Sequence, residues 1–257
     1  MNSRIRRMIS LIEPATAPDD EAHALPLGRP PRCFALVPCA GVGARAGTAL
    51  PKQYTAMRGR PLVAHTLQAL RDCKAIHATL VVIGAQDRDF EQLLPVTEHD
   101  RNWLVRAGGA TRALTVLGGL AALRQRGARD QDWVLVHDAA RCLLRPEWVE
   151  RLIAACVGDA VGGLLALPVS DTLKREHDGH VLLTLSRQGL WAAQTPQMFR
   201  LALLEQALAR AGGDVTDEAS AIEALGHRPL LVSGEWENLK ITWPADFALA
   251  ERLLGTR

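Results

Sequence analysis

The sequence lacks closely spaced pairs of cysteines. Its five cysteines are scattered along the chain, are odd in number and never occur in a CxxC spacing. These properties argue against both a disulfide framework and a zinc site. Because free thiols persist in a reducing compartment, we expect a cytoplasmic protein.

Long apolar runs and long basic runs are missing as well. No apolar segment approaches the ~18 residues that a membrane span requires, and the apolar stretch at 8–12 is too short for a secretory signal. Thirty basic and 28 acidic side chains leave a net charge of +2, and only a short arginine cluster at 4–7 concentrates positive charge. We therefore expect neither a membrane nor a nucleic acid as a partner.

The overall composition is that of an ordinary globular protein, with 48% hydrophobic and 23% charged residues among 257. That length suits one large domain or two small ones. Residues 1–31 are an exception, because they are rich in proline and mixed charge and show no helical or strand period. We expect a disordered N-terminal tail at 1–31 and one folded domain at 32–257.

Hydrophobic patterning after the tail alternates between short apolar runs and amphipathic segments. The runs have the length and flanks of buried strands, and the amphipathic segments repeat at helical spacing. This alternation predicts an α/β fold with a doubly wound, mostly parallel, Rossmann-like sheet, whose ligands bind at the carboxyl ends of its strands. We expect strands at 34–37, 78–83, 103–105, 133–136, 162–169 and 230–232, and helices at 61–73, 87–94, 111–126, 147–156, 199–210, 216–225 and 244–254.

The loop at 38–54, after the first expected strand, has the features of an anion site. Its three glycines allow close approach of the backbone and present N–H donors, while Arg45 and Lys52 add positive charge. The loop is neither a complete dinucleotide fingerprint nor a P-loop, because no third glycine opens a helix and Lys52 follows a proline. From spacing alone, a phosphate site and a simple tight turn both stay open.

Other expected strand ends carry polar groups too. Asp138 follows the strand at 133–136 and suits Mg²⁺ that is held mainly by phosphates and water. Alternatively, Asp138 caps the next helix or pairs with Arg141. The glycine-rich segment at 107–112 precedes a helix, so its N–H groups could receive a base edge or a phosphate.

Residues 170–190 depart from the alternation of strands and helices. Two strand-like segments, 171–175 and 181–185, flank a turn that contains Asp178-Gly179, which predicts a β-hairpin arm. The edges of such an arm need cover, and a second subunit is the economical answer.

Seven short motifs carry a more specific signal when they are taken together. They are Pro-Cys-Ala-Gly-Val-Gly-Ala-Arg (38–45), Pro-Lys-Gln-Tyr (51–54), Val-His-Asp-Ala-Ala-Arg (136–141), Pro-Val-Ser-Asp-Thr-Leu-Lys (168–174), Gln-Thr-Pro-Gln (194–197), Thr-Asp-Glu-Ala-Ser (216–220) and Asn-Leu-Lys-Ile-Thr (238–242). In order and spacing they resemble 2-C-methyl-D-erythritol 4-phosphate cytidylyltransferases over nearly the whole chain after the tail.

This resemblance implies a nucleotidyltransferase that couples CTP to 2-C-methyl-D-erythritol 4-phosphate. The products are 4-(cytidine 5'-diphospho)-2-C-methyl-D-erythritol and pyrophosphate, in the non-mevalonate route to isoprenoids. The resemblance also implies Mg²⁺ as cofactor and a homodimer joined through the hairpin arms.

The resemblance further assigns roles to single residues. Arg45 and Lys52 match the catalytic pair that stabilises the transition state, and Asp138 matches the carboxylate near the metal. The residues expected to position the substrate are Asp138, Arg141, Thr172, Arg187, Thr195, Thr216 and Lys240. The residues expected to bind the nucleotide are Ala40, Gly41, Gly43, Gly109, Arg112 and Thr115.

Three other functions compete with this one. A polyol-phosphate cytidylyltransferase would share the nucleotide half and differ at Arg187 and the arm, where the acceptor sits. An inactive nucleotide-binding protein would not need Arg45, Lys52, Asp138 and Lys240 together. A dinucleotide-dependent oxidoreductase rests only on the fold class.

The sequence also departs from the family's usual pattern at a few positions. Cys39 stands where alanine is expected, Leu114 and Thr115 where an acidic residue and a serine are common, and Ser170 where arginine is frequent.

Overall fold

Seven strands form one central sheet in the computed structural model, which describes residues 29–41, 50–94, 101–212 and 215–256. Residues 31–257 form one compact unit, and the description below concerns this unit. Most of the tail expected at 1–31 lies outside the described residues, so the division of the chain near residue 31 stays a prediction.

The elements follow one another in the order that the figures label. The strands of the central sheet are β1 (Cys33–Pro38), β4 (Ile76–Val82), β5 (Asn102–Val105), β6 (Trp133–Val136), β7 (Gly162–Pro168), β10 (Trp191–Arg200) and β11 (Leu230–Ser233). Two small antiparallel pairs are β2 (Ala56–Met57) with β3 (Arg60–Pro61), and β8 (Leu173–His177) with β9 (His180–Leu185). The helices are η2 (Lys52–Tyr54, a 3-10 turn), α1 (Leu62–Asp72), α2 (Asp89–Leu93), α3 (Arg112–Gln125), α4 (Pro146–Cys156), α5 (Leu201–Ala211), α6 (Glu218–Ala224) and α7 (Pro244–Leu254).

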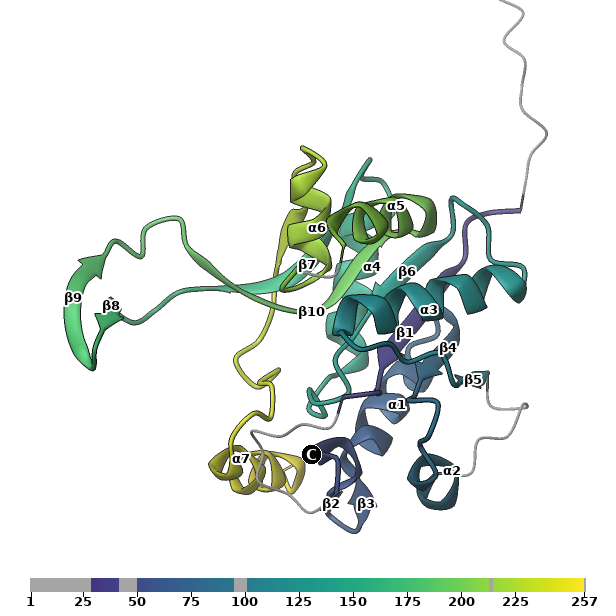
Figure 1. Cartoon of the computed structure of the whole chain (residues 1–257), viewed down its shortest axis with the longest axis horizontal. Helices are drawn as coiled ribbons and strands as arrows, with labels where there is room; N and C mark the ends of the chain where they lie inside the picture. Colours follow the sequence, from purple (N-terminus) through teal and green to yellow (C-terminus); the bar gives the residue numbers. More distant parts are fainter. Residues whose placement is uncertain (1–28, 42–49, 95–100, 213–214, 257) are drawn as a thin grey trace, which may run out of the picture. The chain divides into compact units, whose positions relative to one another are not determined.

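The central sheet has the strand order β11-β7-β10-β6-β1-β4-β5 (Figure 1). Its neighbours pair in parallel except for β10, which runs antiparallel to both β6 and β7. The prediction of a mostly parallel α/β sheet is therefore confirmed. The chain leaves β1 toward β4 and β5 on one side and returns to β6 on the other, so the topological switch point lies at the end of β1.

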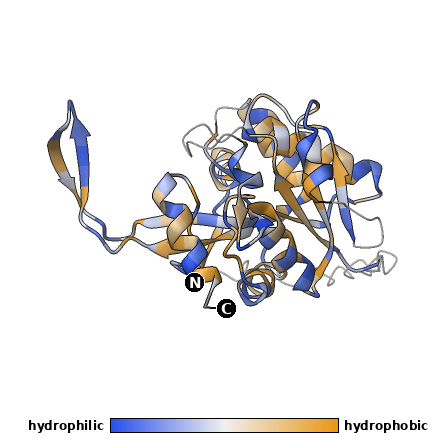
Figure 2. Cartoon of the chain, turned by 90° about the horizontal axis from the view of Figure 1, so that it is seen from below, coloured by the Kyte–Doolittle hydropathy of each residue, from blue (hydrophilic) through white to orange (hydrophobic). Residues whose placement is uncertain are grey.

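Helices cover both faces of the sheet because side chains of its strands alternate between two cores. In β1, Phe34 and Leu36 pack with α3, α5 and α6, whereas Ala35 and Val37 pack with α1 and α4. Figure 2 shows the central strands coloured mainly as hydrophobic. Burial on both faces explains why these strands read as continuous apolar runs rather than alternating ones.

The hairpin predicted at 171–185 is present as β8 and β9, which form a two-stranded sheet of their own (Figure 1). Asp178 and Gly179 both have positive φ, of 50° and 76°, at the turn between the strands. Such angles belong to the tight turn whose twist suits a hairpin, and an Asp-Gly pair adopts it readily.

Strand β10 is an element that the sequence analysis does not foresee. The helix expected at 199–210 starts at Leu201 instead, because Phe199 still belongs to the sheet, where it pairs with Val134. A register shift between Ala193 and Gln197 interrupts the alternation of β10, and its polar residues obscure the strand pattern.

Other element bounds agree closely with expectation, with β6 and α7 beginning and ending as predicted. Helix α6 begins two residues later than expected, because the carboxylate of Asp217 accepts a hydrogen bond from the N–H of Ser220 at 2.9 Å and so makes Asp217 the N-cap. Among the described helices, none combines the length and the apolar character needed to cross a lipid bilayer.

Asp132, just before β6, is a fully buried carboxylate held by two arginines. Its oxygens accept hydrogen bonds from the guanidinium groups of Arg32 at 2.8 Å and Arg129 at 2.9 Å, and from both backbone N–H groups. Burial alone would raise its pKa, but the hydrogen bonds from Arg129 and Arg32 outweigh burial and lower the pKa of Asp132 to about 2.

We expect Asp132 to make stability depend on acid pH. Because its pKa is lower in the folded than in the unfolded chain, its contribution is complete above about pH 4 and is lost as the pH falls toward 2. Asp132→Asn should lower the free energy of unfolding at pH 7, by on the order of 2 kcal/mol more than at pH 2. Urea unfolding at both pH values measures this, and an equal loss at the two would contradict it.

Candidate active site

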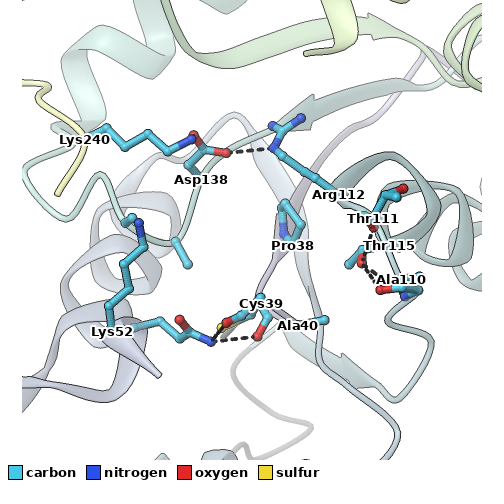
Figure 3. A pocket seen from close by; sticks show the side chains of 15 residues that line it. Pro38, Cys39, Ala40, Lys52, Ala110, Thr111, Arg112, Thr115, Asp138 and Lys240 are labelled. Atoms are coloured by element: carbon cyan, nitrogen blue, oxygen red, sulfur yellow. Dashed lines mark hydrogen bonds and ion pairs between the residues drawn. The ribbon is translucent and has the colours of Figure 1, made fainter. Parts of the chain in front are cut away.

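A cleft of about 450 Å³ opens at the carboxyl ends of β1 and β6, at the predicted edge of the sheet (Figure 3). Its walls come from the end of β1, from η2, from the loop before α3, from the loop after β6 and from the segment around Lys240. Lys52 and Lys240 lie on one side of it and Arg112 and Thr115 on the other. The volume falls within the range of ~300–1,000 Å³ that is usual for small-molecule sites.

Asp138 lies at the centre of the charged groups in this cleft. Its Oδ1 accepts from Nε of Arg112 at 3.0 Å, and its Oδ2 pairs with Nζ of Lys240 at 2.7 Å. The guanidinium of Arg141 lies further away, 3.9 Å from Oδ2. Three segments of the chain therefore converge on one carboxylate.

The protonation of Asp138 follows from these neighbours. Burial disfavours the charged form, but Arg112 and Lys240 outweigh it and hold the pKa of Asp138 well below its ordinary value. Asp138 is thus a permanent anion near neutral pH. It is suited to bind a cation and poorly suited to accept a proton as a general base.

Two buried side chains behind the cleft hold the backbone of Asp138. The N–H of Asp138 donates to Oγ1 of Thr195 at 3.1 Å, and this hydroxyl also lies 3.1 Å from Nδ1 of His137. The Nε2 of His137 is 3.2 Å from the carbonyl oxygen of Arg141, which can only accept. Burial lowers the pKa of His137 to about 4, so a neutral ring that donates through Nε2 fits all three contacts.

The two lysines of the cleft are tied together through Ile241. Nζ of Lys52 donates to the carbonyl oxygen of Ile241 at 2.8 Å, and the N–H of Ile241 donates to the carbonyl of Ala140 at 2.9 Å. The side chain of Ile241 is fully buried in a small apolar cluster with Met57 of β2, Leu62 of α1 and Ala250 of α7. Lys240 is therefore held at the cleft by the burial of its neighbour.

The first residues of the glycine loop are hydrogen-bonded to η2, the turn that carries Lys52. The side-chain amide of Gln53 donates to the carbonyl oxygens of Cys39 at 3.1 Å and Gly41 at 2.8 Å. On the opposite wall, Oγ1 of Thr115 accepts from the N–H of Gly109 at 3.1 Å and donates to the carbonyl of Thr111. These hydrogen bonds hold the backbone at Cys39 and Gly41 on one wall and at Gly109 on the other.

Comparison with known proteins gives this arrangement a family. The family model described as 2-C-methyl-D-erythritol 4-phosphate cytidylyltransferase matches residues 33–256. The chain belongs to this family.

Named relatives agree with this assignment. The chain is 54% identical to the 2-C-methyl-D-erythritol 4-phosphate cytidylyltransferase of Chromobacterium violaceum, over 87% of this chain and 98% of the relative. It is also 55% identical to a bifunctional enzyme of Albidiferax ferrireducens, IspD/IspF. That match covers 88% of this chain but only 54%, about half, of the relative. A crystal structure of 4-diphosphocytidyl-2C-methyl-D-erythritol synthase superposes with a TM-score of 0.78 at 42% identity, over 87% of this chain and 98% of that one.

Most of the residues expected from the cytidylyltransferase resemblance meet in the cleft. They are Ala40, Gly41, Lys52, Gly109, Arg112, Thr115, Asp138 and Lys240. Arg45 and Gly43 lie outside the described residues, so their roles stay predictions.

Five expected residues do not line the cleft of this one chain. Thr195 is buried behind Asp138, and Arg141 donates to the carbonyl of Asn238. Arg187 and Thr172 are exposed at the base of the arm, and Thr216 is exposed before α6. If Arg187, Thr172 and Thr216 contact the substrate, they must do so from outside the part of the cleft that this one chain forms.

Sequence reasoning missed two residues that shape the site, Gln53 and Glu218. Gln53 lies within a quoted motif, beside Lys52, and Glu218 within another, but neither was assigned a role. The carboxylate of Glu218 accepts hydrogen bonds from both terminal nitrogens of Arg112, at 2.6 Å from Nη1 and 3.0 Å from Nη2. Gln53 and Glu218 contact other residues of the protein and not a ligand, so the ligand-binding motifs of the family give no sign of their importance.

Gly108 sets how closely the two loops of the cleft approach each other. A Cβ at this position would clash with Cβ of Ala40 and lie 2.8 Å from the carbonyl oxygen of Ile83. Gly108→Ala should therefore push the loops apart and lower the free energy of unfolding by ~1–3 kcal/mol. Gly84→Ala is the control, because nothing lies within 4 Å of its added Cβ. Thermal unfolding compares the two, and equal stabilities would refute the close approach.

Proposed function

We propose that the chain transfers the cytidylyl group of CTP to the phosphate of 2-C-methyl-D-erythritol 4-phosphate and releases pyrophosphate, a step of the non-mevalonate route to isoprenoids. The observation that carries this proposal is that three cations, Lys52, Lys240 and Arg112, line one cleft with Asp138 where β1 and β6 end. It occurs in a chain that belongs to the cytidylyltransferase family.

The reaction makes a specific demand on the protein. An oxygen of the acceptor phosphate bonds to the α-phosphorus of CTP, while the bond from that phosphorus to the oxygen bridging to the β-phosphorus breaks. Pyrophosphate leaves with the electron pair. The phosphate monoester is already an anionic nucleophile, so the protein must hold two anions in line and neutralise their charge rather than supply a base. The low pKa of Asp138 and the burial of His137 agree with this demand.

The lysines suit two different tasks in this reaction. Lys52, beside the glycine loop, is positioned to meet charge that develops on the α-phosphate oxygens, together with Arg45. Lys240 already binds an oxygen of one anion, Asp138, and can exchange it for the acceptor phosphate. Arg187 is proposed to hold the same phosphate, and Thr172, Thr216, Arg141 and Thr195 to support the acceptor.

The nucleotide is proposed to lie along the backbone of Ala40, Gly41 and Gly109, with Thr115 holding the second loop. The backbone groups there can read the base, as Gly43 is also expected to do. Arg112 faces this site as well, but its nitrogens are occupied by two carboxylates. Its contribution is therefore to charge and alignment more than to direct phosphate binding.

Mg²⁺ is the proposed cofactor, and the donor set fits an ion that arrives with CTP. Asp138 is the single carboxylate among the described residues that line the cleft, and no group of three or more metal-ligating side chains occurs among the residues described. Mg²⁺ usually keeps phosphate oxygens and waters as ligands beside one or two carboxylates. When bound, it would supply charge neutralisation at the triphosphate.

A homodimer joined through the arms is proposed from the exposed residues of β9. Val181, Leu182 and Leu183 are 63, 58 and 39% exposed, and β8 and β9 pair only with each other among the described strands. An apolar hairpin with open edges is a liability unless another chain covers it. A partner's arm would also bring Arg187 and Thr172 to the cleft. All five cysteines are buried and none forms a disulfide, which favours the cytoplasm as location.

Release of pyrophosphate tests the function directly. We expect release that requires CTP, 2-C-methyl-D-erythritol 4-phosphate and a divalent cation together. Lys52→Ala should lower turnover by ~10²-fold or more while leaving thermal stability nearly unchanged. The exposed Lys74→Ala is the matched control and should keep full turnover. Release with ribitol or glycerol phosphate but not with the methylerythritol phosphate would instead favour a polyol-phosphate cytidylyltransferase.

Mixing two inactive variants tests whether the arm of one subunit serves the cleft of the other. Lys52→Ala disables its own cleft, and Arg187→Ala disables its own arm. In mixed dimers the intact cleft of the Arg187→Ala chain meets an intact arm, so random reassociation should restore about a quarter of the sites. If activity stays at the level of the separate variants, Arg187 acts within its own chain.

A further inference from the structure

Glu218 is a buried acid that the cleft does not use directly. It is the first residue of α6, its side chain is fully buried, and it lies outside the lining of the cleft. Both of its oxygens are engaged by Arg112, from Nη1 at 2.6 Å and from Nη2 at 3.0 Å. Two parallel bonds of this kind fix the plane of the guanidinium as well as its position.

This pairing decides which edge of Arg112 faces the cleft. With both terminal nitrogens on Glu218, Nε is the donor that meets Oδ1 of Asp138, at 3.0 Å. Arg112 cannot make a two-pronged contact with a phosphate unless it releases Glu218. Burial alone would lower the pKa of Arg112, but Glu218 and Asp138 raise it, so the guanidinium stays charged.

The start of α6 is capped without the side chain of Glu218. The helix start is already fixed by the reciprocal bonds of Asp217 and Ser220. The side-chain amide of Gln197 adds two further contacts, accepting from the N–H of Ala219 and donating to Asp217, both at 2.8 Å. A buried ion pair adds little net stability compared with an apolar pair of similar size. Stability therefore gives no sufficient reason for an acid at this position.

We propose that Glu218 is a positioning residue for the transfer reaction, which holds Arg112 so that Asp138 stays aligned in the cleft. This inference rests on the proposed function. Glu218, Arg112, Asp138 and Lys240 form a chain of alternating charges whose sum is zero. These ion pairs link α6 and α3 to the loop after β6. Glu218, which lies away from the substrates, can therefore set the geometry of Asp138, which faces them.

The proposal separates the alignment of the site from its affinity for anions. Without the charge of Glu218, Arg112 keeps its positive charge and gains freedom to turn toward other anions. The affinity for CTP should then stay equal or rise, whereas the transfer step should slow. A role in folding alone would instead reduce the amount of active protein and leave the KM and kcat of each active site unchanged.

Kinetics of Glu218→Gln, which keeps the shape and removes the charge, measures this separation. We expect kcat to fall 10- to 100-fold while the KM for CTP does not increase. Glu218→Asp keeps the charge on a shorter side chain and should recover part of the lost kcat. A Glu218→Gln protein with the kcat of the unaltered chain, or with a raised KM for CTP and an unchanged kcat, would overturn the proposal.

Asp132→Asn is the matched control for these variants. Asp132 is equally buried and also paired with arginine, but it lies at the opposite end of β6 from Asp138. This control should lose stability and keep kcat and both KM values. If Asp132→Asn lowers kcat as strongly as Glu218→Gln, the effect is structural and the proposal is wrong.

A crystal structure of Glu218→Gln tests the contact without any turnover. The Nε of Arg112 should leave Oδ1 of Asp138, and a contact still near 3.0 Å would overturn the proposal. If the unaltered chain releases no pyrophosphate from CTP and the methylerythritol phosphate, the proposed function fails, and this structure still decides whether Glu218 positions Arg112.

Discussion

The cleft at the carboxyl ends of β1 and β6 depends on one interaction, the pairing of the buried carboxylate of Asp138 with cationic side chains. Asp138 could not remain ionised where it lies without cations, because an unpaired buried charge costs several kcal/mol. Arg112 reaches it from α3 and Lys240 from the segment before α7, so regions far apart in the sequence must meet at the end of β6. The cleft is the space between these converging segments. Its electrostatics therefore follow from the same contacts that hold its walls together.

Most of the fold could be predicted because its core is periodic. Strands such as β6 are buried on both faces and read as apolar runs, while α7 is bounded by a proline and a glycine. β10 escaped because one strand combines an irregular register with polar residues that serve the site: Thr195 holds Asp138, and Gln197 holds the start of α6. Local pattern indicates secondary structure well only where burial is the main demand on a residue.

The site could be predicted only in part, for a related reason. Asp138 and the start of the glycine loop closely follow strand ends, where the architecture places ligands, and Lys52 lies in a motif that carries the family resemblance. Gln53 and Glu218 bind other protein groups, so their importance depends on distances across the fold. Arg187 and Thr172 raise a different difficulty, because a single chain does not bring them to the cleft.

The neighbouring strands β7 and β10 have a further consequence. Pro168 lies opposite Trp191 in their antiparallel register, and the N–H of Val169 donates to the carbonyl of Leu190 at 3.0 Å. The arm is thus an excursion from a closed base, and its length and sequence can change without altering the alignment of either strand. A change within the arm can therefore alter what the arm contacts while the pairing of β7 with β10 stays the same.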